Sequence, residues 1–157
     1  MNKNATQFLA LVQREVLRFT RRPYNTFLPP IITNVLYFSV FGVILGSRIG
    51  EIAGVSYLQL VLPGLVLLGA SSDSFDNASF TIFHGRWNDY IQAVVTSPMS
   101  NWTMLAAYVS ASALRGVVTS LLIAGVGLLF TSVAVANPLY LTAFLLVITV
   151  LFASLGV

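Results

Sequence analysis

Long apolar stretches without charged residues dominate the chain and predict membrane-spanning helices. No charge occurs in four stretches, residues 23–47, 52–72, 90–114 and 116–157. A helix rises ~1.5 Å per residue, so about 20 apolar residues cross a hydrocarbon core of ~30 Å. We therefore predict an all-α integral membrane protein with four crossings, over residues 27–46, 58–83, 102–130 and 139–157. Between the second and third crossings, residues 84–101 form a polar and aromatic loop.

The segment before the first crossing, residues 6–22, has the period of an amphipathic helix. Its apolar residues recur at helical spacing, namely Phe8, Val12, Val16 and Phe19. Its basic residues lie largely elsewhere on the helical wheel, namely Arg14, Arg18, Arg21 and Arg22. Such a helix lies along a membrane surface with its arginines toward anionic headgroups, which makes membrane lipid a partner. Pro23 is expected to end it, and Pro29 and Pro30 to open the first crossing.

The distribution of basic residues predicts the orientation. Five precede the first crossing, whereas residues 47–57 hold only Arg48. The positive-inside rule therefore places the N-terminus and the loop at 84–101 in the cytoplasm.

Composition excludes several other classes of protein. The chain is 57% hydrophobic and 8% charged, whereas about a quarter of the residues of soluble domains are charged. With no cysteine, and with His84 as the sole histidine, a zinc site of the usual kind is excluded. The net charge of +3 does not indicate nucleic-acid binding, because half of the eight basic residues lie between Arg14 and Arg22.

Three charged residues fall inside the predicted crossings. Asp73 and Asp76 are three positions apart and share a helix face, and Arg115 lies in the third crossing. Each costs about 2.5–3.5 kcal/mol at a membrane centre on insertion scales. We expect Arg115 to form an ion pair with one aspartate, facing the protein interior. These residues line a substrate path, form an assembly contact, or extend (snorkel) to the inner membrane surface.

Glycine and proline suggest where helices pack or bend. Glycines recur every fourth residue at Gly42, Gly46, Gly50 and Gly54. In an apolar helix this spacing permits close approach of another helix, although the last two positions belong to the predicted external turn. Pro63, followed by Gly64, is expected to kink the second crossing, either for gating or for packing.

A series of short motifs resembles a known family. The central block includes Phe41-Gly42, Gly46-Ser47-Arg48-Ile49-Gly50, Ser56-Tyr57-Leu58-Gln59 and Leu62-Pro63-Gly64-Leu65. Flanking motifs are Leu28-Pro29-Pro30-Ile31-Ile32, Leu36-Tyr37-Phe38, Ser97-Pro98 and Arg115-Gly116. Together they resemble the permease subunit of type-2 ATP-binding-cassette (ABC) exporters, in particular the YadH-type permeases of bacterial inner membranes.

The resemblance implies a six-helix permease that forms a homodimer and binds two copies of a separate ATPase subunit. Residues 6–22 would be an interface helix, and the loop at 84–101 would carry a coupling helix that contacts the ATPase. The coupling residues would be Arg86, Trp87, Asp89, Tyr90, Ser97 and Pro98. Because the chain has four crossings and stops within an apolar run, we expect residues 1–157 to be the N-terminal portion of such a permease.

The chain itself is not expected to be an enzyme or to bind a cofactor. The nearest match to a phosphate-binding loop, Gly64 to Gly69, has Ala70 where the lysine is required, so ATP and Mg²⁺ would bind the partner ATPase. Trp87 and Tyr90 either dock into that partner or belong to the interfacial aromatic belt.

The sequence leaves three candidate functions for the chain. The first is a subunit of an ATP-driven exporter in the bacterial inner membrane, moving an unidentified substrate outward. The alternative is a gradient-driven, proton-coupled carrier that uses Asp73 and Asp76. A membrane anchor is disfavoured, because an anchor needs no charged residues inside the membrane.

Overall fold

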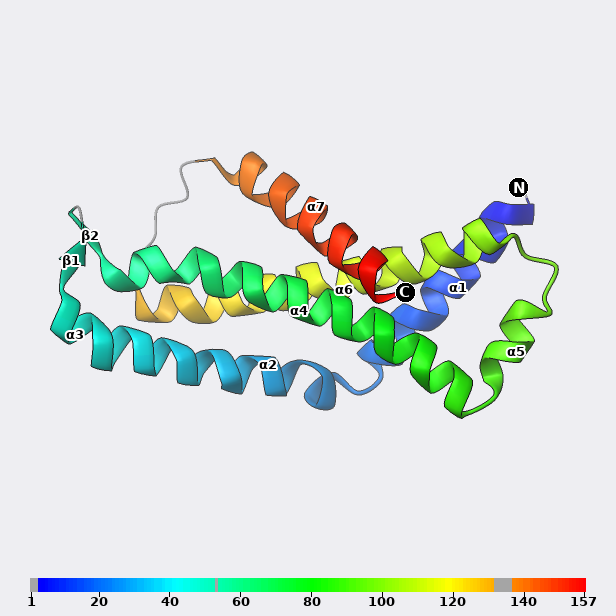
Figure 1. Cartoon of the computed structure of the whole chain (residues 1–157), viewed down its shortest axis with the longest axis horizontal. Helices are drawn as coiled ribbons and strands as arrows, with labels where there is room; N and C mark the ends of the chain where they lie inside the picture. The colour runs from blue at the N-terminus through cyan, green and yellow to red at the C-terminus, as the bar shows by residue number, and fades with distance from the viewer. Residues whose placement is uncertain (1–2, 53, 132–136) are drawn as a thin grey trace.

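The computed structural model describes residues 3–52, 54–131 and 137–157 and consists almost entirely of helices (Figure 1). Its longer helices are α1 (Lys3–Thr20), α2 (Pro23–Phe38), α4 (Tyr57–Trp87), α6 (Asn101–Phe130) and α7 (Pro138–Gly156). The shorter helical elements are a π-helix η1 (Ser39–Leu45), α3 (Gly46–Ile49) and α5 (Tyr90–Val95). A short antiparallel hairpin separates α3 from α4, and its strands, β1 (Glu51–Ile52) and β2 (Val55–Ser56), have two residues each.

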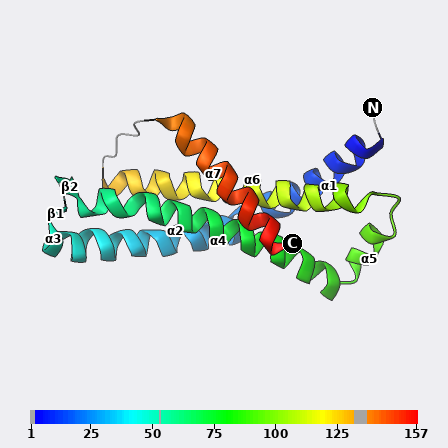
Figure 2. The ribbon, with the colours of Figure 1, turned by 45° about the horizontal axis from the view of Figure 1, so that its top comes forward.

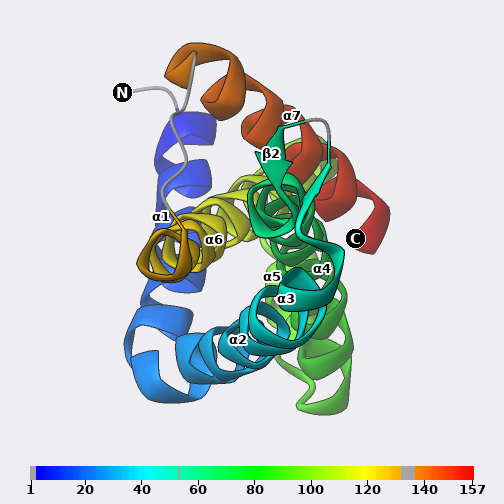
Figure 3. The same ribbon diagram turned by 90° about the vertical axis from the view of Figure 1, so that its left-hand side faces the viewer.

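Helices α4 and α6 run antiparallel along the whole length of the molecule (Figure 1). The hairpin lies at one end of this pair, and α1 and α5 lie toward the other end. Helix α2 runs alongside the part of the α4–α6 pair that is nearer the hairpin, and α7 crosses the pair diagonally (Figure 2). Viewed from the hairpin end, α2 and α7 lie on opposite sides of the pair (Figure 3).

Four of the described helices are long and apolar enough to cross a membrane. They span Pro23–Ile49, Tyr57–Trp87, Asn101–Phe130 and Leu139–Gly156. The all-α class and the four membrane-spanning helices that the sequence predicts are therefore confirmed.

The start of the first crossing differs from the prediction. Pro23 occupies the first position of α2, where its missing N–H has no intrahelical partner to lose. Pro29 and Pro30 therefore lie inside the helix rather than in its opening turn. Because α1 ends at Thr20, the connection that follows it contains Arg21 and Arg22.

The second crossing extends beyond its predicted end at residue 83 into the polar loop at 84–101, which also holds a short helix where the resemblance implies the coupling helix. Helix α4 continues to Trp87, and α5 forms a second helical segment within the loop. Asp89 joins the two with a φ of 57°, a left-handed conformation that Asp adopts more readily than bulky residues do.

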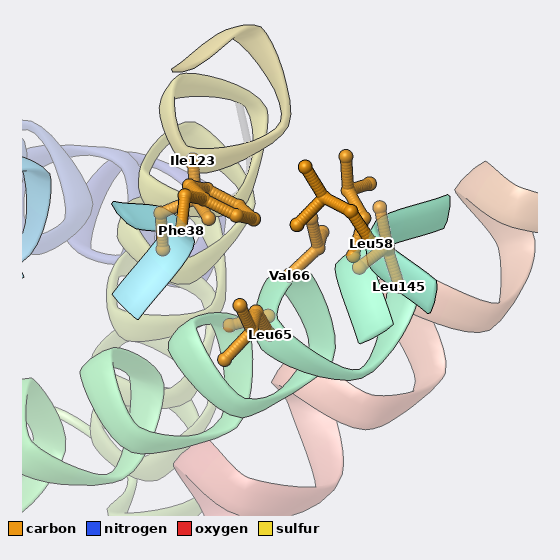
Figure 4. Close-up of a cluster of buried hydrophobic side chains, with 8 residues drawn as sticks. Phe38, Leu58, Leu65, Val66, Ile123 and Leu145 are labelled. Atoms are coloured by element: carbon orange, nitrogen blue, oxygen red, sulfur yellow. The ribbon is translucent and has the colours of Figure 1, made fainter. Parts of the chain in front are cut away.

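Two clusters of buried apolar side chains hold the helices together. Figure 4 shows the larger one, in which Phe38, Leu58, Ile123 and Leu145 bring together α2, α4, α6 and α7. The second joins α1, α5 and α6 through Leu11, Val94, Ala107 and Tyr108. The second cluster fixes the position of α1 relative to the membrane-spanning pair.

Of the two regularly spaced glycines within the first crossing, Gly42 and Gly46, only Gly42 lies against another helix. A Cβ at Gly42 would come within 3.0 Å of the Leu58 side chain of α4, whereas the nearest atom to one at Gly46 is the carbonyl oxygen of Phe41. Gly50 and Gly54 have φ values of 69° and 79° in the hairpin region, as suits the predicted turn.

Candidate functional site

An ion pair between α4 and α6 forms the centre of the candidate site. Arg115 donates from Nη2 to Oδ1 of Asp73 at 2.9 Å and from Nε to Oδ2 at 3.1 Å. The Thr119 hydroxyl donates to the same Oδ2 at 2.8 Å. The Asp73 and Arg115 side chains are 10% and 20% exposed. The acidic partner suggested by the sequence is therefore Asp73, and two parallel hydrogen bonds orient the pair.

Asn77 extends this ion pair along α4. Its Oδ1 accepts a hydrogen bond from Nη1 of Arg115 at 2.9 Å, and its Nδ2 donates to Oγ of Ser112 at 2.9 Å. Asn77 is 3% exposed. All three nitrogens of the Arg115 guanidinium therefore have partners on α4.

Helix α1 joins the same cluster through Arg18. Its Nη2 donates to Oδ1 of Asn77 at 3.0 Å and to the hydroxyl of Thr81. The same nitrogen lies 3.2 Å from Oε2 of Glu15, which is 1% exposed. We call this set the three-helix polar network: Glu15, Arg18, Asp73, Asn77, Thr81, Ser112, Arg115 and Thr119.

Glu15 is held within the network by charge. Its oxygens lie 3.2 Å from Nη2 of Arg18 and 3.6 Å from Nε of Arg14. Among the described residues, neither oxygen meets the geometry of a hydrogen bond. Burying a carboxylate is expensive unless an opposite charge lies nearby, and Arg14 and Arg18 of the same helix supply that charge, while Arg18 also links α1 to α4.

The second aspartate does not share this environment. Asp76 is exposed and lines a depression beside α4, whereas Asp73 is buried. Residues three apart on a helix are offset by about 60°, and here that offset is enough to move the Asp76 side chain off the packed face. The expectation of one shared face for both aspartates therefore fails.

Several members of the network could have been found by looking for polar residues at helical spacing. Asp73, Asn77 and Thr81 lie four residues apart on α4. On α6, Ser112 and Thr119 flank Arg115 at three and four residues. Glu15 lies midway between the buried Leu11 and Phe19 of α1, which is a signal that it faces inward.

Helices α1 and α5 contact each other at the end of the molecule opposite the hairpin. The Arg14 guanidinium carbon lies 4.8 Å from the ring centroid of Tyr90, and Nε2 of Gln7 donates to the carbonyl oxygen of Pro98 at 3.2 Å. Leu11 and Val94 pack together in the second apolar cluster. The predicted interface helix and the predicted coupling segment are therefore in contact through side chains.

The two aromatic residues predicted to dock with a partner differ in exposure. Tyr90 is half-buried beneath Arg14, whereas Trp87 is 76% exposed and stacks on Phe83 of the same helix. Arg86 and Asp89 are exposed, and the Ser97 hydroxyl donates to the carbonyl oxygen of Val94. Trp87 is therefore accessible to a partner, and Tyr90 stabilises the contact within the chain.

An open groove of about 1000 Å³ lies between α1, the start of α2 and α4, and Tyr90 of α5 and Arg115 of α6 also line it. Five arginines line it, namely Arg14, Arg18, Arg21, Arg22 and Arg115. His84, Phe80 and Asn25 also contribute, and no Asp or Glu belongs to its described lining. We call this feature the arginine groove.

The described residues offer ion pairing and anion binding rather than metal binding. No group of three or more His, Cys, Asp or Glu side chains within residues 3–52, 54–131 and 137–157 could hold a metal ion. Arginine guanidinium groups bind carboxylates and phosphates through fixed, planar donor geometry.

Comparisons with known proteins connect this architecture to a family. Residues 6–157 match the family model described as ABC-2 type transporter. The chain is 31% identical over 143 residues to the inner membrane transport permease YadH of Escherichia coli (strain K12), which covers 91% of this chain and 56% of the relative. The protein of the same name in Shigella flexneri matches to the same extent. The chain thus spans a little over half the length of these relatives, and no solved structure matches it.

Proposed function

Because the chain belongs to the ABC-2 type transporter family, we propose that it acts as the membrane-spanning subunit of an ATP-driven exporter. It would work in a bacterial inner membrane with its N-terminus in the cytoplasm and move its substrate outward. The support for this orientation is the excess of basic residues before the first crossing.

The contact between α1 and α5 is the observation that favours an ATPase-coupled mechanism. Arg14 packs on Tyr90 of α5, and Gln7 binds the carbonyl of Pro98 just after that helix. From α1, Arg18 continues to Asn77 and Thr81 of α4. A push on α5 would therefore reach α4 and α6 through side chains that are already in contact.

ATP and Mg²⁺ would bind a separate ATPase subunit, which would dock on the exposed surface around α5. Trp87, Gln92 and Val95 belong to that surface and are accessible. A second copy of the permease would complete the transporter. In this mechanism the chain performs no covalent chemistry, and its function is to change conformation.

The geometry of Asp73 counts against the alternative of a proton-coupled carrier. Both of its carboxylate oxygens already accept hydrogen bonds, from Arg115 and Thr119. A proton carrier needs a carboxylate that exchanges protons during transport, and this one would first have to leave its arginine. Asp76 is exposed and forms no ion pair with a described residue.

Cysteine crosslinking tests the proposal, since the chain has no cysteine of its own. We would introduce Gln92→Cys on the exposed face of α5 and Glu51→Cys in the hairpin as the matched control. Gln92 is preferred to Asp89, because a Cys at a φ of 57° would strain the turn. Bacterial membranes containing the full-length protein would be treated with a short bifunctional reagent.

We expect Gln92→Cys to form an adduct with an ABC ATPase and to react with thiol reagents only from the cytoplasmic side. Glu51→Cys should form no such adduct and should react from outside. An ATPase adduct at Glu51, or labelling of Gln92→Cys from outside alone, would contradict the proposed orientation and function. Labelling of Gln92→Cys from inside without an ATPase adduct would support the gradient-driven carrier instead.

A further inference from the structure

We propose that the arginine groove binds the phosphate group of an anionic phospholipid. Its described lining has five arginines and no carboxylate. The carboxylates of Glu15 and Asp73 offset part of this charge by pairing with Arg18 and Arg115, and Asp76 lines the adjoining depression that also includes Arg115. The groove nevertheless keeps an excess of positive charge, which attracts anionic headgroups at a membrane surface.

Two of the arginines have donors available for a ligand. Arg21 and Arg22 are exposed in the connection between α1 and α2 and form no ion pair with any described residue. Arg14 contributes a third charge, since its contact with Glu15 is long at 3.6 Å. The guanidinium groups of Arg18 and Arg115 already have partners, so they supply positive potential but few free donors.

The position of the groove favours a lipid over a phosphate dissolved in water. Arg21 and Arg22 directly precede Pro23, where the first membrane-spanning helix begins. Basic residues at this position lie at the depth of the headgroups. Phe80 lines the groove, and Phe83 lines the adjoining depression; they are 56% and 60% exposed. Such exposed aromatic rings suit contact with the glycerol and upper acyl region of a lipid.

This inference does not require an ATPase partner, an export direction or a particular substrate. It needs only that α1 lies at a membrane surface with the groove facing the headgroups. The two proposals are tested at different residues, because the lipid is assigned to Arg21 and Arg22 between α1 and α2, whereas Gln92 lies on α5 and does not line the groove. The failure of one proposal is therefore distinguishable from the failure of the other.

Native mass spectrometry of the purified full-length protein tests the site. Phosphatidylglycerol and phosphatidylcholine of the same acyl composition would be titrated separately in detergent. We expect the first phosphatidylglycerol to bind about tenfold or more tightly than phosphatidylcholine, because each basic residue near an anionic headgroup adds to the attraction. Equal affinities of the two lipids would overturn the proposal.

Charge variants locate the binding. The double variant Arg21→Gln/Arg22→Gln should lose most of the preference for phosphatidylglycerol, whereas Arg21→Lys/Arg22→Lys should keep much of it. Arg48→Gln is the matched control, since Arg48 is an exposed arginine near the hairpin at the opposite end of the molecule. An equal loss in Arg48→Gln would show general charge attraction and overturn the site. Helix content measured by circular dichroism should be the same in all variants.

Competition identifies the source of the phosphate. Millimolar inorganic phosphate should leave bound phosphatidylglycerol in place, because it lacks the glycerol and acyl contacts. Displacement by inorganic phosphate at that concentration would identify the groove as a site for a water-soluble phosphate and overturn the lipid assignment.

Discussion

At the scale of single residues, the three-helix polar network explains how charged groups are accommodated between apolar helices. The Arg115 guanidinium has partners in Asp73 and Asn77, and the Asn77 amide oxygen also accepts from Arg18. A buried ion pair is often no more stabilising than a well-packed apolar pair, but removing one partner is costly. The network therefore fixes how α1, α4 and α6 are placed relative to one another.

Single and double substitutions of the central ion pair test this account. Asp73→Asn and Arg115→Leu should each lower the free energy of unfolding by on the order of 3 kcal/mol, since each leaves a buried charge without its partner. The double variant should be more stable than the sum of the two losses predicts. Unfolding in mixed micelles titrated with sodium dodecyl sulfate would measure these values.

Asp76→Asn is the matched control for the ion pair. It makes the same chemical change on the same helix, but at an exposed side chain, so its effect should stay within about 0.5 kcal/mol. Strictly additive losses in the double variant would show that Asp73 and Arg115 do not interact.

At the scale of the elements, the close approach of α4 and α6 depends on small residues. A Cβ at Gly116 would lie 1.8 Å from Oγ of Ser74 and 2.9 Å from the carbonyl oxygen of Ala70. Small residues allow membrane helices to pack backbone against backbone, where dispersion replaces the hydrophobic effect. The regular glycine spacing in the first crossing predicts a close helix contact at Gly42, but a Cβ at Gly116 would lie closer to its neighbours than one at Gly42.

Alanine at Gly116 should therefore disturb the pair of long helices. Gly116→Ala is expected to lower the free energy of unfolding by about 1–3 kcal/mol through overpacking. Gly125→Ala on the same helix is the control, because no atom lies within 4 Å of the added Cβ. Equal stability of the two variants in the same micelle assay would contradict the observed helix separation.

The predicted crossings agree with the observed helices over most of their length, and the differences lie at the ends. Apolar residues without charges specify that a segment is helical in a membrane, since lipid offers no other partner for the backbone. The ends depend on local effects that are weaker signals. The first crossing begins at Pro23, four residues earlier than predicted, because proline suits the first position of a helix. Helix α4 extends to Trp87, and the chain turns only at Asp89.

At the scale of the whole molecule, the four crossings differ in the fraction of their residues that is buried inside the protein. In the most apolar part of each crossing, 39% of residues are buried for the second and 33% for the third, against 12% for the first and 17% for the fourth. The first crossing in particular presents Ile32 and Leu36 of α2 and Val40 of η1 outward. Its outer face must contact lipid or another apolar helix.

A charge on that outer face should impair insertion. Leu36 lies at the middle of the first crossing and is 61% exposed, so Leu36→Lys should cost about 2.5–3.5 kcal/mol of insertion free energy. Leu36→Ile should have little effect, since it keeps the apolar surface. Insertion of the two variants would be compared by glycosylation mapping in microsomal membranes. Efficient insertion of the lysine variant would argue that this face is in contact with water.

The sequence by itself determined that the chain is an integral membrane protein with four apolar crossings, and its motifs indicated the family. These properties are local, because the length and charge of each segment suffice to specify them. Only the tertiary structure decided which polar groups meet. It paired Arg115 with Asp73 and left Asp76 exposed, brought Glu15 into the interior, and placed α1 against α5. Such contacts depend on the rotation and crossing of helices far apart in the chain, which the pattern along a single segment does not specify.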